Sequence, residues 1–309
     1  MSEGRVFALF GHPVSHSLSP VIHGAAYAAL GLAYTFRAID LPTEADLVRA
    51  FDDLRAGKFG GANVTLPHKR AALEMADVVD ASAVEPGVAN VLCRDDDGRI
   101  HAYNTDAEAL ARDIETDLPE APRLHAVVIG GGGAGFAAVV ACRKLGYERV
   151  GVTSRSWLSR EYLETLPVTG RMRALGAEVF PWPSNDPGSG PLAVQRLQSE
   201  WFEFVRASSL VVQATSAGMA GADAGEAVTE IVPWAELAQH TLAYDVVYNP
   251  PVTPFLRAAM AHGLLARGGL GMLVRQAARS IELWIGQSPP LDVMQRAAEQ
   301  AFDRQGPAG

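Results

Sequence analysis

The stretch His125-Ala-Val-Val-Ile-Gly-Gly-Gly-Gly-Ala-Gly135 decides the fold of this chain. His125–Ile129 is a short apolar run of the kind that forms a buried parallel strand, and the glycines after it predict a tight turn. Phe136–Leu145 then predicts a helix that Gly146 ends, and Glu148–Thr153 predicts a second strand. Strand, glycine turn, helix and strand together make a βαβ unit of a parallel sheet.

The glycine turn indicates a nucleotide site. The first turn of a helix has unpaired N–H groups and a partial positive charge, which attract phosphate. Glycines let a pyrophosphate approach the backbone, because any Cβ there would hold it away. A glycine turn can also be only a tight link between strand and helix, but the surrounding pattern favours a Rossmann-like, doubly wound parallel sheet that binds a dinucleotide.

The residues after the second strand favour NADP(H). An NAD site usually places Asp or Glu there for the ribose 2′-hydroxyl, whereas this chain has Ser154-Arg155-Ser156. An arginine between two hydroxyls suits a 2′-phosphate. From Arg143 to Arg173 there are seven basic and three acidic residues, a local excess of +4. The alternative is a solvated helix end with scattered surface arginines.

The composition fits a globular protein of two domains. The chain has 309 residues, of which 48% are hydrophobic, and domains are commonly ~100–200 residues long. With 26 Lys and Arg against 35 Asp and Glu, the net charge is −9, which argues against nucleic-acid and anionic-membrane binding. Two cysteines, Cys93 and Cys142, are too few for a disulfide framework or a Cys-based zinc site, so we expect a cytoplasmic protein.

One stretch reaches membrane-spanning length without a charged residue. Leu124–Cys142 has 19 residues, close to the ~20 that a spanning helix needs, but its central glycines would weaken an isolated helix. We therefore expect no membrane segment, and the N-terminus lacks the features of a signal peptide. Pro181–Pro191, rich in proline, glycine and serine, predicts a surface loop.

Before residue 107 the pattern predicts a second α/β unit. The expected strands and helices are Val6–Phe10, Pro20–Leu30, Tyr34–Ile39, Glu44–Arg55 and Gly61–Thr65. Polar clusters follow expected strand ends at residues 11–20, 63–69 and 103–106. Open α/β sheets bind ligands at the carboxyl ends of their strands, so these clusters are candidate substrate residues.

Each cluster also has a purely structural interpretation. Ser19 and Pro20 suit the N-cap and first position of a helix, Lys69 could be a surface lysine, and Asn104 could cap the next helix. Taken together, their hydroxyls, amides, lysine and carboxylate suit reduction of a polyhydroxylated carbonyl compound. Ketone reduction needs a proton donor at the oxygen, and a Lys–Asp pair can supply and hold that proton.

Other chemistries have no visible basis. His12 and His16 are four residues apart, but Pro13 between them disfavours a helical pair, and no carboxylate–histidine spacing supports a zinc site. We expect no metal. A Gly-x-Ser-x-Gly elbow, which a serine hydrolase of the α/β class needs, is absent from the sequence.

Six motifs, in this order, resemble those of the shikimate dehydrogenase family, including its quinate/shikimate branch. They are His16-Ser-Leu-Ser-Pro20, Asn63-Val-Thr-Leu-Pro-His-Lys69, Asn104-Thr-Asp106, Gln213-Ala-Thr-Ser-Ala-Gly218, Asp245-Val-Val-Tyr-Asn-Pro250 and Gly269-Leu-Gly-Met-Leu-Val-Arg-Gln276. The resemblance covers nearly the whole chain.

The resemblance implies a role for each motif. Lys69 and Asp106 would be the catalytic acid–base pair. The residues that would bind the substrate's carboxylate and hydroxyls are Ser17, Ser19, Thr65, Asn90, Tyr248 and Gln276. The residues that would hold the cofactor are Gly130, Gly132, Gly133 and Ala134 at the pyrophosphate, Ser154, Arg155 and Ser156 at the 2′-phosphate, and Val246 and Gly269 near the nicotinamide.

The resemblance also implies an architecture and a reaction. Residues 1–105, completed by C-terminal helices in 270–309, would form an α/β substrate domain, and residues 106–269 a Rossmann-like NADP domain. The apolar pattern of Leu270–Trp284 fits such a helix. The implied reaction is reversible NADPH-dependent reduction of 3-dehydroshikimate to shikimate, in aromatic amino-acid biosynthesis, by a monomer or homodimer.

Departures from the family pattern leave alternatives open. Gly87-Val-Ala-Asn90-Val91 has a methyl where the family usually has a threonine hydroxyl, and Ala107 stands where Gly is usual. With Tyr103, Val91 keeps open a paralogue that acts on quinate or an aminoshikimate, with NAD as its cofactor. A catalytically inactive NADP-binding sensor is the alternative of another class; the presence of both Lys69 and Asp106 argues against it.

Overall fold

The computed structural model describes residues 4–118, 120, 122–183 and 200–305. The chain divides into two compact units, one of Met1–Ala109 with Leu273–Gly306 and one built from Leu110–Met272. The sequence-based domain limits remain a prediction.

The first unit is built on a mixed six-stranded sheet in the order β2-β1-β3-β5-β6-β4. Its strands are β1 (Val6–Gly11), β2 (Thr35–Asp40), β3 (Gly61–Val64), β4 (Val78–Val79), β5 (Val91–Arg94) and β6 (Ile100–Tyr103). Its helices are α1 (Ser19–Ala29), α2 (Glu44–Arg55), α3 (Lys69–Met75), α4 (Ala81–Val84), α13 (Leu291–Gln305) and parts of α5 (Asp106–Asp117) and α12 (Leu270–Ile285). Strands β1, β2 and β3 are parallel, whereas β5 is antiparallel to both of its neighbours.

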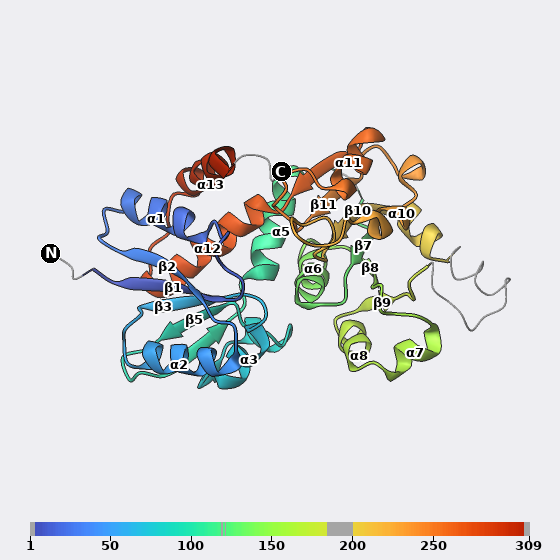
Figure 1. Ribbon diagram of the computed structural model, residues 1–309. Coiled ribbons are helices and arrows are strands. Elements are labelled where there is room, and N and C mark those ends of the chain that lie inside the picture. Colours follow the sequence, from blue (N-terminus) through green and yellow to red (C-terminus); the bar gives the residue numbers. More distant parts are fainter. Residues whose placement is uncertain (1–3, 119, 121, 184–199, 306–309) are drawn as a thin grey trace. The chain divides into compact units, whose positions relative to one another are not determined.

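Helix α2 covers one face of this sheet (Figure 1). It occupies the residues that the sequence predicts, because Thr43 and Asp46 form a capping box at its start. Leu47, Phe51 and Leu54 are fully buried along one side of the helix. Their spacing by three and four residues makes the apolar stripe that a sheet-covering helix needs.

The C-terminal helix α12 covers the opposite face (Figure 1). Trp284 donates a 3.0 Å hydrogen bond from Nε1 to the carbonyl of Leu92, and its ring stacks on Phe7 with centroids 4.8 Å apart. Glycine is required at Gly61, because a Cβ there would collide with the Trp284 indole. Residues from the far end of the sequence therefore complete the core of the N-terminal unit.

The second unit carries an all-parallel six-stranded sheet in the order β12-β11-β10-β7-β8-β9. Its strands are β7 (His125–Ile129), β8 (Arg149–Thr153), β9 (Ala177–Val179), β10 (Ser208–Gln213), β11 (Leu242–Asp245) and β12 (Leu265–Gly268). Its shorter helices are α6 (Gly133–Lys144), α7 (Arg160–Thr165), α8 (Pro167–Ala174), α10 (Glu226–Glu230), the 3-10 turn η1 (Trp234–Glu236) and α11 (Pro254–Ala261). Strand order reverses between β7 and β10, which is the switch point where doubly wound sheets bind ligands.

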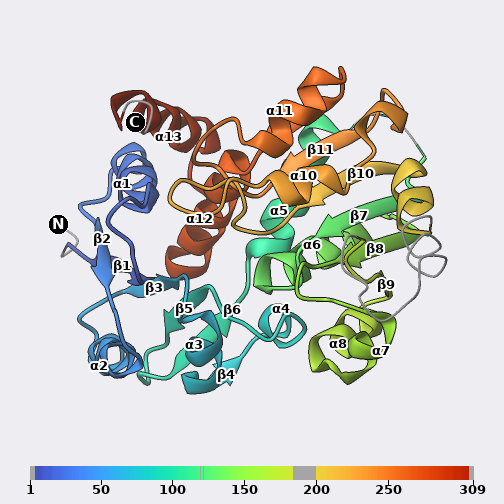
Figure 2. The same ribbon diagram turned by 45° about the vertical axis from the view of Figure 1, so that its right-hand side comes forward.

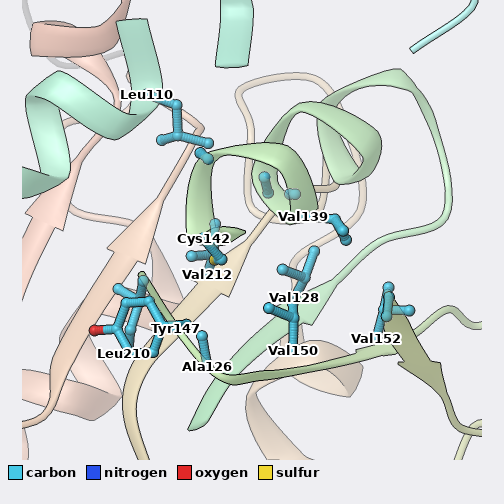
Figure 3. Close-up of a cluster of buried hydrophobic side chains, with 14 of the residues drawn as sticks. Leu110, Ala126, Val128, Val139, Cys142, Tyr147, Val150, Val152, Leu210 and Val212 are labelled. Carbon is cyan, nitrogen blue, oxygen red and sulfur yellow. The ribbon is translucent and has the colours of Figure 1, made fainter. Parts of the chain in front are cut away.

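The predicted α/β fold with a Rossmann-like sheet is confirmed. Figure 3 shows the core between α6 and its sheet, where Val128, Val150 and Val212 from three neighbouring strands meet Val139 and Cys142 of the helix. All five are fully buried. A run of β-branched residues on central parallel strands produces this core because both faces of the sheet are covered.

Three local expectations need comment. Helix α6 begins at Gly133, three residues before the predicted Phe136. The N-cap assignment of Ser19 is wrong: Leu18 is the N-cap, and Ser19 already lies in the helix. Of the predicted loop Pro181–Pro191, only residues 181–183 are described, and there Trp182 is buried; the rest lies outside the described residues.

The candidate span Leu124–Cys142 forms strand β7, a glycine turn and helix α6. Across the described part of the chain, no helix combines the length and apolarity needed to cross a bilayer.

Candidate functional site

One edge of the first unit's sheet gathers the three polar clusters. Strands β1 and β3 are parallel, and their carboxyl ends lead to Gly11 and Thr65. Strand β5 runs the other way, so Asn90 at its start lies at the same edge, as does Asn104 after β6. A 2.8 Å bond from the His12 N–H to the Leu66 carbonyl joins the first two clusters. Sheet register thus brings together residues that are far apart in sequence.

Lys69 and Asp106 form the chemical centre of this edge. Lys69 Nζ lies 2.6 Å from Asp106 Oδ2, with the lysine side chain 25% exposed and the carboxylate 7% exposed. Lys69 is the first residue of α3 and Asp106 the first of α5. The lysine is therefore not a surface lysine, and its ammonium reaches solvent or ligand while the carboxylate stays buried behind it.

Asn90 holds the other side of the Asp106 carboxylate. Its Nδ2 donates a 2.7 Å bond to Asp106 Oδ1 and lies within 3.1 Å of both Thr105 Oγ1 and Gln276 Oε1. An amide nitrogen has only two hydrogens, so three acceptors compete for them. Asn90 Oδ1 in turn accepts the Thr105 N–H at 2.9 Å, which fixes which way the amide faces.

The turn before α5 aims Asp106 at this centre. Asn104 Oδ1 accepts the Asp106 N–H at 3.0 Å, and Asn104 Nδ2 donates to the Val88 carbonyl at 3.0 Å. Asn104 thus stabilises the turn before α5 and also bonds that turn to the segment 87–90. The capping interpretation and the functional interpretation of Asn104-Thr-Asp106 are compatible.

Ser17, Ser19 and Thr65 lie at the same edge without bonding to the lysine pair. Ser17 Oγ accepts the Ser19 N–H at 3.2 Å, and Ser19 is 7% exposed. Among the described residues, neither serine hydroxyl nor that of Thr65 is bonded to Lys69, Asp106, Asn90 or Gln276. A Cβ at Gly11 would collide with Thr65 Cγ2, so glycine there leaves room for Thr65.

The glycine turn of the second unit leads directly into the first turn of α6. Gly130 has φ +141°, and a Cβ there would lie 2.6 Å from the Ala214 carbonyl oxygen. Gly132 is the N-cap of α6, makes no side-chain cap, and a Cβ there would meet no protein atom within 4 Å. Gly133 and Ala134 follow in the first turn. The space beside Gly132 at the helix start is therefore free of protein atoms, and the first-turn N–H groups have no side-chain cap there.

Arg155 lies beside this turn but is not a free cation. Gly131 packs against the segment after β8, where a Cβ would lie 2.7 Å from Trp157 and 3.2 Å from Ser154. Arg155 Nη2 pairs with Asp223 Oδ2 at 2.7 Å, and both side chains are close to half exposed. Arg155 and Ser156 are exposed and Ser154 is half-buried, so all three remain accessible to a phosphate.

The basic excess between Arg143 and Arg173 is not an open cationic surface. Arg149 pairs with Glu178, Arg160 with Glu200 and Arg173 with Glu164. Two of these acidic partners lie outside the counted window, so a local charge count could not include them.

The remaining candidates of the second unit follow strand β11. Val246 donates its N–H to the Gln213 carbonyl at 3.0 Å, and a Cβ at Gly269 would collide with the Val246 carbonyl. Val246 and Gly269 are therefore neighbours, as their shared expected role requires. Tyr248 is half-buried, and burial raises the pKa of its phenol.

The structure adds a buried carboxyl that the sequence did not single out. Asp245 is fully buried and accepts bonds from the Thr253 hydroxyl at 2.6 Å, the Val247 N–H at 2.9 Å and Gln213 Nε2 at 3.3 Å. Burial raises the pKa of Asp245 to about 7. Asp245 and Gln213 are each the first residue of one of the six family-like motifs. That position was the sequence feature from which their importance could have been predicted.

The second unit also has a cavity of about 540 Å³ that is bordered by helices α7 and α8 and strand β9. Its lining includes His125 and Arg149 at the starts of β7 and β8. The arginines that line it are engaged by glutamates of the same wall. The described residues that line this cavity do not include Gly130 or Ser154, and its arginines are already paired, so it is not the candidate cofactor site.

Comparison with known proteins agrees with this arrangement. Residues 9–92 match the family model "Shikimate dehydrogenase substrate binding domain" and residues 269–299 match "Shikimate 5'-dehydrogenase C-terminal domain". A shikimate dehydrogenase (NADP(+)) of Symbiobacterium thermophilum is 35% identical over 98% of this chain and 96% of the relative. One of Rhizobium rhizogenes is 33% identical over 93% of this chain and 91% of the relative.

Solved structures give the same result. Shikimate 5-dehydrogenase of Thermus thermophilus, in complex with NADP(H) and shikimate, is 32% identical with a TM-score of 0.77, covering 96% of this chain and all of that one. Quinate dehydrogenase of Corynebacterium glutamicum, in complex with NAD, is 26% identical with a TM-score of 0.78, covering 96% and 98%. With a matching fold and relatives of this identity over nearly its full length, the chain belongs to the shikimate dehydrogenase family.

Proposed function

We propose that this protein catalyses the reversible, NADPH-dependent reduction of 3-dehydroshikimate to shikimate. The observation that carries the proposal is the contact of Lys69 with Asp106, backed by Asn90, at the ligand-binding edge of the first unit's sheet. Relatives that are similar over nearly the whole chain are named shikimate dehydrogenase (NADP(+)).

Lys69 is the proton donor in this mechanism. Its ammonium is held by Asp106 on one side and stays partly exposed on the other. As the carbonyl carbon is reduced, the oxygen gains negative charge, and Lys69 transfers a proton to it, forming the hydroxyl of shikimate. In the reverse direction the neutral lysine takes that proton back, so the same pair serves as acid and as base.

Asp106 and Asn90 keep the lysine in position. Asp106 presents one carboxylate oxygen to Lys69 and the other to Asn90, so the carboxylate cannot rotate without breaking a bond. Because Asn90 also lies 3.1 Å from Gln276, a substrate hydroxyl that bonds to either amide would be aligned with the proton donor. Ser17, Ser19, Thr65 and Tyr248 are the other proposed substrate-binding residues.

The second unit fits NADP(H). Gly130, Gly132, Gly133 and Ala134 form an open helix start for the pyrophosphate, and Ser154, Arg155 and Ser156 offer a guanidinium and two hydroxyls for the 2′-phosphate. Val246 and Gly269 are the proposed nicotinamide neighbours. When bound, NADPH supplies the hydride that the carbonyl carbon receives.

Removal of the lysine tests the assignment. We expect Lys69→Met to lower kcat for shikimate oxidation by at least about 100-fold, because general acid–base groups contribute ~10²–10⁴-fold. The matched control is Arg70→Met, the next residue of α3, whose side chain is 81% exposed and pairs with Glu74 on the helix surface. Steady-state rates should separate the two variants; equal rates would contradict the role of Lys69.

A substrate and cofactor panel tests the function itself. We expect kcat/KM, measured for shikimate and quinate with NADP and with NAD, to be highest for shikimate with NADP. No turnover in any combination at high enzyme concentration would overturn the proposal and favour an inactive sensor. A preference for quinate would assign the protein to that branch.

Val91 is fully buried between Asn63 and Tyr103 in the sheet register, so it would act on substrate choice through these neighbours.

A further inference from the structure

The Arg155–Asp223 pair concerns cofactor choice. We propose that Asp223 competes with the cofactor's 2′-phosphate for Arg155 and so reduces the preference of this enzyme for NADP over NAD. The inference rests on the proposed function, because it requires Arg155 to be the residue that meets the 2′-phosphate. It adds a specificity-determining residue from a loop that lies 68 positions away in the chain.

Asp223 is ionised at neutral pH. The hydrogen bond from Arg155 and the N–H of Gly225 both hold the pKa of its carboxyl below the usual range. The 2.7 Å distance from Arg155 Nη2 to Asp223 Oδ2 makes this a direct ion pair. A full negative charge therefore already occupies one edge of the guanidinium before cofactor binds.

The loop backbone fixes the position of this carboxylate independently of the arginine. Asp223 Oδ1 accepts the Gly225 N–H at 3.0 Å, and the Asp223 carbonyl accepts the Gly218 N–H at 2.8 Å. Gly218 and Gly225 both have φ near +80°, which glycine adopts readily. Asp223 is thus part of a formed turn rather than a side chain that Arg155 has drawn toward itself.

The two cofactors differ in how this carboxylate affects them. A 2′-phosphate is an anion, so binding it on Arg155 places two anions on one guanidinium, and they repel each other. NAD carries a neutral 2′-hydroxyl at that place, which can donate a hydrogen bond to a carboxylate. In NAD-binding sheets an acidic residue at the end of the second strand does this, and this chain has none there. Asp223 comes from a different loop and places its carboxylate on Arg155, which follows that strand.

Binding measured without substrate tests the competition. We expect Asp223→Asn to lower the Kd of NADP(H), measured by fluorescence titration, by about threefold at low salt, as for an exposed charge pair. The Kd of NAD(H) should stay the same or rise. The gain for NADP(H) should shrink in 0.5 M KCl because salt screens exposed charges. Asp223→Ser, which keeps an acceptor for Gly225, should give the same direction.

The matched control removes an equal charge elsewhere in the same unit. Arg206 and Glu236 form an exposed pair at 2.6 Å, and Glu236→Gln should leave both dissociation constants unchanged. An unchanged or weaker affinity for NADP(H) in Asp223→Asn, or an equal gain for NAD(H), would overturn the inference. Arg155→Met distinguishes failure of the proposed 2′-phosphate site from failure of the inference about Asp223. If Arg155→Met leaves NADP(H) affinity intact, the proposed 2′-phosphate site is wrong. If it weakens that affinity while Asp223→Asn changes nothing, only the inference about Asp223 is wrong.

Discussion

Asp245 shows how much a single buried residue can determine at this site. It closes strand β11, and its two oxygens accept bonds from Thr253, Val247 and Gln213. These bonds tie the end of β10 to the loop after β11, which carries Val246 and Tyr248. Burial disfavours the charged carboxylate more strongly than these donors favour it, so its pKa rises to about 7.

The raised pKa predicts a pH-dependent stability. In the unfolded chain this carboxyl has a pKa near ~3.9, so between about pH 4 and 7 the folded state binds more protons. Its contribution to the free energy of unfolding is therefore complete at low pH and is lost as pH rises toward 7. Asp245→Asn cannot titrate and should lack this slope. Urea unfolding at pH 5 and pH 7.5 should show wild type losing on the order of 2 kcal/mol relative to the variant; parallel pH profiles would contradict the assignment.

At the scale of elements, the turn between β7 and α6 uses its glycines for different purposes. A Cβ at Gly135 would collide with the Gly130 carbonyl, whereas one at Gly132 would meet no protein atom within 4 Å. Gly135 therefore allows helix and strand to pack closely, and Gly132 leaves space outside the protein. Of these two glycines, only Gly132 is among the predicted cofactor residues.

Two alanine substitutions should separate these roles. Gly132→Ala should leave the melting temperature nearly unchanged and weaken NADPH binding by about tenfold or more, because its methyl would occupy the pyrophosphate space. Gly135→Ala should lower the free energy of unfolding by about 1–3 kcal/mol, as overpacking does. Thermal melts and fluorescence titrations measure the two effects. A destabilised Gly132→Ala with normal NADPH affinity would reverse the assignment.

At the scale of the whole molecule, the chain crosses between its two units at α5 and α12, since both unit boundaries fall inside these helices. Figure 2 shows the C-terminal helix α13, in dark red, beside the blue helix α1 of the first unit. The N-terminal sheet thus depends on residues at the other end of the sequence, with Trp284 bonded to Leu92 and stacked on Phe7.

Removing Trp284 should therefore destabilise one unit more than the other. Trp284→Ala takes a large aromatic ring out of the first unit, which we expect to cost about 3–5 kcal/mol. The other four tryptophans (Trp157, Trp182, Trp201 and Trp234) belong to the second unit. In the variant, urea unfolding followed by far-UV circular dichroism should begin at lower urea than unfolding followed by tryptophan fluorescence. A single coincident transition would show that the units unfold together.

Local patterns in the sequence were enough to predict much of this protein. The β-branched run and glycines at 125–135 predicted a parallel, doubly wound sheet, and the helix predicted at Glu44–Arg55 has the same bounds in the structure. Both rest on short-range rules: backbone freedom at glycine and side-chain periodicity in helices and strands. The order of motifs then pointed to the family and to Lys69 and Asp106 as a pair.

Tertiary structure decided what depends on contacts between distant residues. The sheet register and the packing of helix α12 bring Asn90 against Asp106 and Gln276. Only the fold gives Arg155 its partner Asp223, and only burial raises the pKa of Asp245. The structure also shows that Leu18, not Ser19, is the N-cap of α1. Two arginines of the predicted basic patch form ion pairs with Glu178 and Glu200, which lie outside that stretch of sequence. Charge pairing, desolvation and hydrogen-bond geometry depend on distance in space, which the order of residues along the chain does not specify.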